Sequence, residues 1–170
     1  MINTRTAVML SQYKAWADRL MFDAVANLPE VEWDRPRQTL FKTMVGTLNH
    51  NYVVDRIWQA HLEGRDHGYT ARNLVLHPKL ADLWQAQQTM NDWVIDWSAK
   101  QSDLTLDEAV PFKFISGEQA VMSRGAIFLH LVNHASYHRG WVAEMFFQVP
   151  AKPPTTDLPV FMVSLDNSVR

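Results

Sequence analysis

Three histidines recur at four-residue intervals in the segment His130-Leu-Val-Asn-His134-Ala-Ser-Tyr-His138-Arg139-Gly140. This spacing predicts one face of an α-helix, because side chains at i and i+4 are neighbours with Cβ atoms about 5–6 Å apart. Two such imidazoles can bind one metal ion, as the histidines of an HExxH helix do. Three cannot easily share one ion, since His130 and His138 lie about 12 Å apart along the helix axis. The segment therefore predicts a metal site built on one adjacent pair.

The apolar residues of this segment indicate which pair faces the interior. An apolar stripe interleaves with His134 and His138 at steps of three and four residues and contains Leu131, Trp141, Val142 and Met145. We therefore expect His134 and His138 to be the ligands. His130, one turn earlier, is a candidate for the pocket around the metal or for a hydrogen bond to a ligand.

A third ligand has to come from another helix, and His50 is the best placed. It shares a helix face with Val53, Val54 and Ile57, and Gly46 one turn earlier lets another backbone approach closely. Three neutral nitrogen ligands would leave coordination positions open for water or substrate, as in catalytic metal sites.

The other histidines and Asp55 fit this site less well. His61 lies about 16 Å from His50 along the helix axis, and His67 and His77 fall in a predicted loop. Asp55 lies about 140° around the helix from His50, which indicates a surface or inter-helix charge. The alternative for all these histidines is a set of hydrogen-bonded core residues without a metal.

Apolar residues recur with helical periodicity in four segments of the chain. The predicted helices span about residues 9–28, 39–62, 79–100 and 124–148. Thr39 is a plausible N-cap of the second helix, and Gly64 ends it. Residues 109–115 and 118–122 predict a short hairpin or extended loop, and residues 158–165 a last short element. The fold class is all-α, a four-helix bundle in a single domain over residues 1–170.

Composition excludes several functional classes. The 170 residues include no cysteine, which excludes disulfides, thiolate metal clusters and a cysteine nucleophile. A net charge of −2 is too balanced for a protein that binds nucleic acid or an anionic membrane. No apolar run is long enough for a transmembrane span or a secretory signal, so we expect a cytoplasmic protein.

Three segments resemble one known family in the expected order. The Asn133-His134 pair followed by His138-Arg139-Gly140 is similar to the late-helix signature of the DinB-like (YfiT-like) metal-binding four-helix bundle family. The stretch 48–58, with His50 and an Asp five residues later, resembles its second-helix motif. The tail 150–162 resembles its ending.

The resemblance implies an up-down-down-up bundle, usually a homodimer, that binds a divalent metal through His50, His134 and His138. Zinc and nickel both occur in the family, and its better understood members are thiol-dependent S-transferases and a maleylpyruvate isomerase. Two positions depart from the family pattern: Tyr137 stands where His is frequent, and Trp141 where Gln is frequent. These departures weaken inference about the substrate more than inference about the metal.

The leading hypothesis is a metal-dependent enzyme that acts on a small molecule, as a thiol-dependent transferase or a hydrolase. A three-histidine metal lowers the pKa of a bound water or thiol, and without cysteine the chain would need a thiol from solution. Arg139 could pair with an anionic substrate, or equally form a solvent-exposed or inter-helix ion pair. Tyr137 and Asn133 flank the ligands and are expected to support packing or hydrogen-bond to them.

Two other hypotheses stay open. In the first, the metal stabilises a structural or stress-response protein without turnover. In the second, the histidines are core residues of a dimeric interaction module. The tryptophans on predicted helices are interpreted as core and interface rather than as a substrate box, and comprise Trp58, Trp84, Trp93, Trp97 and Trp141.

Overall fold

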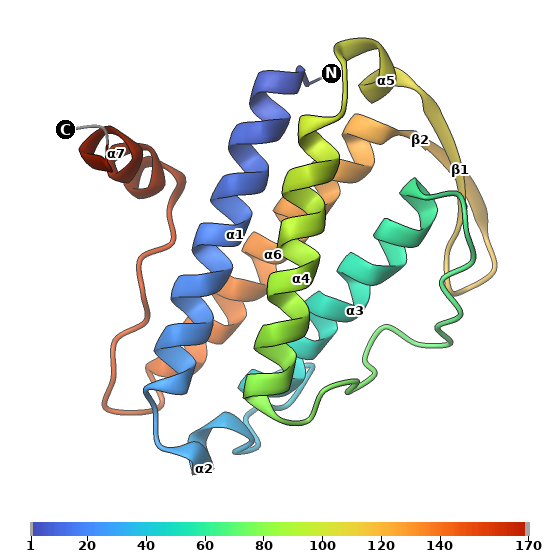
Figure 1. Ribbon diagram of the computed structural model, residues 1–170. Coiled ribbons are helices and arrows are strands. Elements are labelled where there is room, and N and C mark those ends of the chain that lie inside the picture. The colour runs from blue at the N-terminus through green and yellow to red at the C-terminus, as the bar shows by residue number, and fades with distance from the viewer. Residues whose placement is uncertain (1, 169–170) are drawn as a thin grey trace.

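Four long helices lie side by side in the structure, a computed structural model that describes residues 2–168 (Figure 1). They are α1 (Thr4–Ala26), α3 (Met44–Leu62), α4 (Leu80–Ala99) and α6 (Arg124–Phe146). The predicted all-α class is confirmed. The third predicted helix agrees with α4 to one residue at each end, because its apolar periodicity is uninterrupted.

The beginnings of α1 and α6 and the ends of α3 and α4 lie at one end of the molecule (Figure 1). The Thr4 backbone N–H donates to Asp103 Oδ1, just beyond α4, at 2.7 Å. The Arg124 guanidinium at the start of α6 donates to the Leu62 carbonyl, the last of α3, at 3.4 Å. Helices α3 and α6 therefore run in opposite directions against each other, and their facing side chains form the site described below.

Shorter elements connect the long helices. They are α2 (Glu30–Trp33), α5 (Asp103–Asp107) and α7 (Leu158–Ser168). The predicted hairpin is present as antiparallel strands β1 (Ala109–Lys113) and β2 (Gln119–Ser123), in a register that places Pro111 opposite Val121. The predicted last element is α7, whose Phe161 ring lies 5.5 Å from the Trp16 ring, centroid to centroid.

Helix α3 begins four residues later than predicted, because its N-cap is Thr43 and not Thr39. Thr43 Oγ1 accepts a hydrogen bond from the Gly46 N–H at 2.8 Å. Residue Lys42 has φ 67°, which a continuous helix does not allow. Gly46 is required here, since a Cβ would lie 2.5 Å from the Phe41 carbonyl oxygen. This close approach holds the Phe41 segment against α3, as the glycine predicted.

The apolar row Met9, Tyr13, Trp16, Leu20 and Ala24 predicts one buried face for α1, and the structure differs from it. Tyr13 is buried, but Trp16 and Leu20 are only half-buried. Two charged residues, Lys14 and Asp18, are buried instead, with 1% and 5% exposure. Apolar periodicity misses this face because burial of a charge depends on partners from other helices.

The core has two parts. The larger lies between the four long helices, and the smaller lies under the hairpin and contains Val54, Trp58, Leu62, Val110, Phe112, Ile127 and Leu131. The hairpin thus covers the outer faces of α3 and α6 at one end. Across the described residues, no helix combines the length and apolar character needed to cross a membrane.

Candidate metal centre

His50 on α3 meets His134 and His138 on α6. One ring nitrogen from each lies within 4.8 Å of the other two. The His138 ring centroid is 4.5 Å from that of His50 and 4.4 Å from that of His134. His50 and His138 are buried, and His134 is half-buried. The structure therefore brings together the three side chains that spacing and resemblance single out.

A backbone contact orients the His50 ring. Its Nδ1 lies 2.7 Å from the Arg72 carbonyl oxygen, so Nδ1 carries the proton and donates. Nε2 is then unprotonated and lies 3.2 Å from His134 Nε2. Ligands of a tetrahedral ion with bonds of 2.0–2.1 Å are separated by about 3.3 Å. The spacing of these two nitrogens therefore suits two ligands of one ion.

The three imidazoles form a donor set that suits a divalent cation. Each offers one ring nitrogen to the cluster. The Nδ1 atoms of His134 and His138 are buried and have no hydrogen-bond partner among the described residues. A divalent ion that accepts one lone pair from each imidazole fits this donor set of three nitrogens.

All three imidazoles are neutral at pH 7. Burial lowers the pKa of His50, and it lowers the pKa of His138 to about 4, with a further contribution from His50. Burial, reinforced by His138 and His50, lowers the pKa of His134 to about 2. Metal ions bind the neutral form of histidine. No proton therefore has to leave these side chains before a metal binds at neutral pH.

The metal-free protein should lose stability as the pH falls from about 6.5 to 4. Unfolded histidines take up protons near pH 6.5, whereas folded His138 and His134 do so only near about 4 and 2. The unfolded state therefore binds more protons in this window, and each histidine contributes up to about 1.4 kcal/mol per pH unit. Urea unfolding of chelated protein measures the slope. The His134→Gln variant should show a smaller slope, and an unchanged slope would contradict this assignment.

A cavity of about 630 Å³ adjoins the three histidines. Phe41 stacks on the His50 ring with centroids 4.0 Å apart, and Trp141 lies 4.7 Å from the His138 ring. Tyr137 also lines the cavity, 5.0 Å from His138, and is 59% exposed. Tyr137 therefore shares the space around the histidines rather than supporting them from another face, while Asn133 is exposed to solvent.

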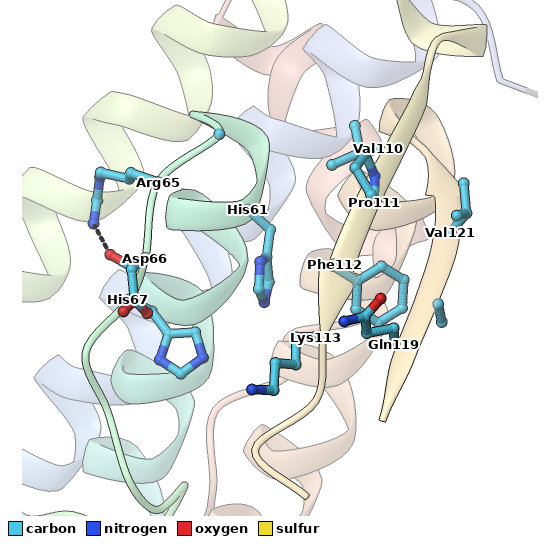
Figure 2. Close-up of a pocket in the computed structure, with 12 residues that line it drawn as sticks. His61, Arg65, Asp66, His67, Val110, Pro111, Phe112, Lys113, Gln119 and Val121 are labelled. Atoms are coloured by element: carbon cyan, nitrogen blue, oxygen red, sulfur yellow. Dashed lines mark hydrogen bonds between the residues drawn. The ribbon is translucent and has the colours of Figure 1, made fainter. Parts of the chain in front are cut away.

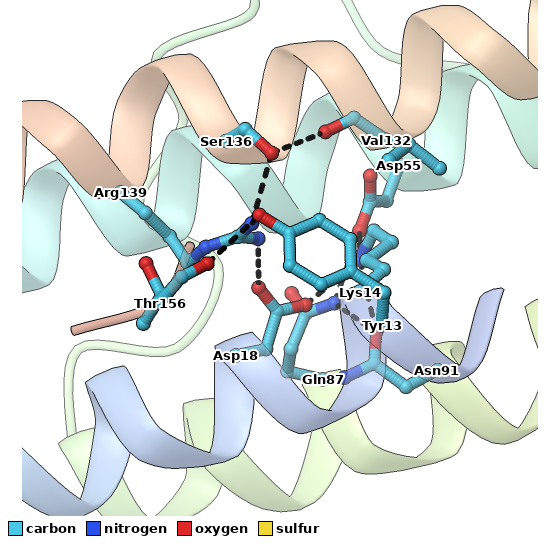
Figure 3. A network of polar contacts seen from close by, with 10 residues as sticks. All are labelled: Tyr13, Lys14, Asp18, Asp55, Gln87, Asn91, Val132, Ser136, Arg139 and Thr156. Carbon is cyan, nitrogen blue, oxygen red and sulfur yellow. Dashed lines mark hydrogen bonds and ion pairs between the residues drawn. The ribbon is translucent and has the colours of Figure 1, made fainter. Parts of the chain in front are cut away.

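Arg139 forms an inter-helix ion pair and is not available to a substrate. It is 2% exposed, and its Nη1 donates to Asp18 Oδ1 at 2.9 Å. Asp55 is likewise an inter-helix charge and not a surface one, since its Oδ2 accepts from Lys14 Nζ at 2.7 Å. Figure 3 shows these groups in one polar network. The network joins all four long helices through Lys14, Asp18, Asp55, Gln87, Asn91 and Arg139.

The network balances two buried cations against two buried carboxylates. Burial alone would lower the pKa of Lys14, but Asp18 and Asp55 together raise it. Burial would raise the pKa of Asp18, but Lys14 and Arg139 together lower it. Burial raises the pKa of Asp55 by more than Lys14 lowers it. Asp55, which follows His50 on α3, and Arg139, which follows His138 on α6, thus anchor these two helices to α1.

Comparison with known proteins identifies the family of this chain. The sequence model of the DinB family matches residues 1–167. The chain belongs to the DinB family. It is 23% identical over 163 residues to Protein DinB of Bacillus subtilis (strain 168), a match that covers 92% of this chain and 93% of that protein.

In this DinB family chain the remaining histidines lie outside the three-histidine cluster. His130 lies 5.4 Å from His134 between ring centroids and lines a smaller cavity next to it. His61 packs 5.4 Å from His67 in a separate pocket between α3, the following loop and β1 (Figure 2). His77 packs 5.2 Å from the Tyr52 ring. The cluster that could hold an ion contains His50, His134 and His138 and none of these last three.

Two residues of the site were missed by reasoning from the sequence. Phe41 falls inside the predicted helix 39–62. The close backbone approach that Gly46 allows could have indicated a turn next to α3 instead. Arg72 lies in a loop without periodicity, so no sequence signal places its carbonyl against His50. Trp58 and Trp141, interpreted as core or interface, also line the cavities next to the histidines.

Proposed function

We propose that His50, His134 and His138 bind one divalent metal ion, zinc or nickel, and that the protein is a metal-dependent enzyme acting on a small molecule. The supporting observation is the convergence of three neutral imidazole nitrogens beside a cavity of about 630 Å³. Structural zinc sites are closed by four protein ligands. Among the described residues, three protein ligands meet here.

The proposed chemistry is of the thiol-dependent S-transferase type. The bound ion would supply Lewis acidity, which lowers the pKa of a coordinated water or thiol. The chain has no cysteine, so the thiol would come from a low-molecular-weight compound in solution. Phe41, Tyr137 and Trp141 would contact the substrate and exclude water from it. Hydrogen bonding to the Arg72 carbonyl would hold the His50 ring in position.

The purified protein should contain about one metal ion per chain, and His50→Ala or His138→Ala should reduce the metal affinity at least about 100-fold. Metal content after dialysis against a weak chelator measures this directly. His77→Ala is the matched control, because its backbone bonds to Asn49 survive the substitution. Full metal retention in both ligand variants would remove the site.

A metal-stabilised protein without turnover is the second candidate. It is favoured by the position of the cluster, which would let one ion join α3 to α6. Cobalt-substituted protein discriminates between the two. A change in the visible spectrum on addition of 2-mercaptoethanol supports a site open to thiols, and a spectrum that does not respond supports a closed structural ion.

The proposal extends to the assembly. We propose one domain with an up-down-down-up helix order, which the helix directions in Figure 1 support. A homodimer is also proposed, supported by the exposed apolar side chains Val160, Met162 and Val163 on α7. Neither nucleic acid nor a membrane surface is a proposed partner, since the net charge of −2 favours neither.

A further inference from the structure

A small cavity of about 110 Å³ lies beside the three-histidine cluster. It shares Arg72, Ile115 and His134 with the cavity of about 630 Å³. The two spaces therefore adjoin at these side chains. A molecule that occupies the large cavity can extend a short group into the small one.

The charges that line the small cavity all have one sign. Its lining contains the cations Arg72 and Lys113, the histidines His61, His130 and His134, and no carboxylate among the described residues. The large cavity likewise has Arg72 and no carboxylate. This positive region lies in a chain whose net charge is −2.

Neither Arg72 nor Lys113 forms an ion pair among residues 2–168, although Lys113 interacts electrostatically with the exposed Asp66 in the neighbouring pocket. Six other arginines pair with carboxylates, namely Arg19, Arg35, Arg37, Arg65, Arg124 and Arg139. Two unpaired cations on one small cavity repel each other, and an anion between them relieves that repulsion.

The surroundings of the two cations suit an anion. The Arg72 carbonyl accepts the His50 Nδ1–H at 2.7 Å, which fixes its backbone beside the cluster. Lys113 is the last residue of β1, and its side chain extends from that strand on the side that faces His61 (Figure 2). Trp58 and Phe112 are buried in the wall of the cavity, whereas Arg72 and Lys113 are exposed to solvent. One exposed charge–charge contact contributes little, so both cations and the apolar wall have to act together on the anion.

We propose that the small cavity is an anion subsite, and that the small molecule handled at the three-histidine cluster carries a carboxylate held between Arg72 and Lys113. This inference rests on the proposed function only in assuming that the ligand also reaches the metal at the three-histidine cluster. The planar guanidinium of Arg72 matches a carboxylate with two parallel hydrogen bonds. Lys113 supplies an ammonium group from the end of β1. The aromatic walls bind the body of the ligand next to the carboxylate.

Calorimetric titration of the metal-loaded protein tests the subsite. The probes are 3-phenylpropanoate and the neutral 3-phenylpropan-1-ol, which have the same aryl body and chain length. The carboxylate should bind at least about tenfold more tightly than the alcohol. Arg72→Gln and Lys113→Gln should each weaken carboxylate binding about tenfold or more, while leaving alcohol binding and metal content unchanged.

Two exposed cations elsewhere serve as matched controls. Arg5→Gln and Lys79→Gln change the net charge equally but lie away from both cavities, so carboxylate affinity should stay within about twofold of wild type. Equal binding of the acid and the alcohol overturns the subsite. Wild-type affinity in the Arg72 and Lys113 variants, or no saturable binding of the carboxylate, overturns it as well.

A metal-free arm separates this inference from the proposed function. Direct coordination of the carboxylate to the metal predicts binding that depends on the metal and not on Arg72 or Lys113, and this result rejects the subsite alone. If metal-free wild-type protein binds the carboxylate and both variants do not, the subsite is supported. If the wild-type protein takes up no metal in a separate metal titration, the proposed function is rejected, but the subsite is not.

Discussion

Replacing Lys14 by methionine should reduce the free energy of unfolding by about 3–5 kcal/mol. Lys14 Nζ donates to Asp18, Asp55 and Asn91 at 2.9, 2.7 and 2.9 Å in the centre of the bundle. Methionine preserves most of the volume but leaves the Asp55 carboxylate without a cation. A buried charge that has lost its partner costs far more than the pair contributed. Urea unfolding with an unchanged m-value would show that the loss is one of stability.

The remainder of the network provides the internal tests. Lys14→Met combined with Asp55→Leu should recover part of the loss, because the uncompensated charge is then gone. Arg19→Met is the matched surface control, since the Arg19–Asp23 pair is exposed and 3.9 Å long. It should change stability by less than about 1 kcal/mol. A loss from Lys14→Met no larger than that of Arg19→Met would contradict a role of the network in stability.

Removal of the metal should lower the melting temperature by roughly 10 °C. Free metal at 1,000 times its dissociation constant stabilises a folded protein by about 4 kcal/mol, and about 1 kcal/mol shifts the midpoint of a chain this size by 2–4 °C. The physical reason is that the ion binds the folded arrangement of α3 and α6 and not the separated histidines of the unfolded chain. Calorimetry before and after chelation measures the shift.

The His50→Ala variant separates loss of the metal from other effects of the chelator. It retains His134 and His138 on α6 but lacks the ligand from α3, so an ion bound to this pair does not join the two helices. Chelation should therefore lower its melting temperature by much less than that of the wild type. An unchanged midpoint in wild-type protein shown to have lost its metal would contradict the proposed link between metal and stability.

The two predictions concern neighbouring parts of the same helices. Asp55 follows His50 on α3, and Arg139 follows His138 on α6. The network therefore restricts rotation of the helices that present the histidines, which is the kind of support that precise ligand placement needs. A weaker metal affinity in Lys14→Met would follow from this coupling.

Local spacing accounts for much of what could be predicted. The i, i+4 histidines of α6 share a face in any α-helix, and the apolar stripe shows that this face is turned inward. The four helices, the hairpin and the close approach at Gly46 likewise depend on nearby residues. The predicted N-cap of α3 was wrong because Thr39 and Thr43 are equally good caps by residue type. The turn at residues 39–42 is held by backbone hydrogen bonds that leave no periodic signal in the sequence.

What the sequence alone determined is therefore the set of helices and the three histidines, because periodicity and spacing act within one helix. The convergence of His50 with α6, the burial of Lys14 and Arg139, and the placement of Phe41 and Arg72 were decided only by the tertiary structure. Each of these depends on a partner from a distant segment, and burial of a charge or a polar nitrogen is favourable only when that partner is present.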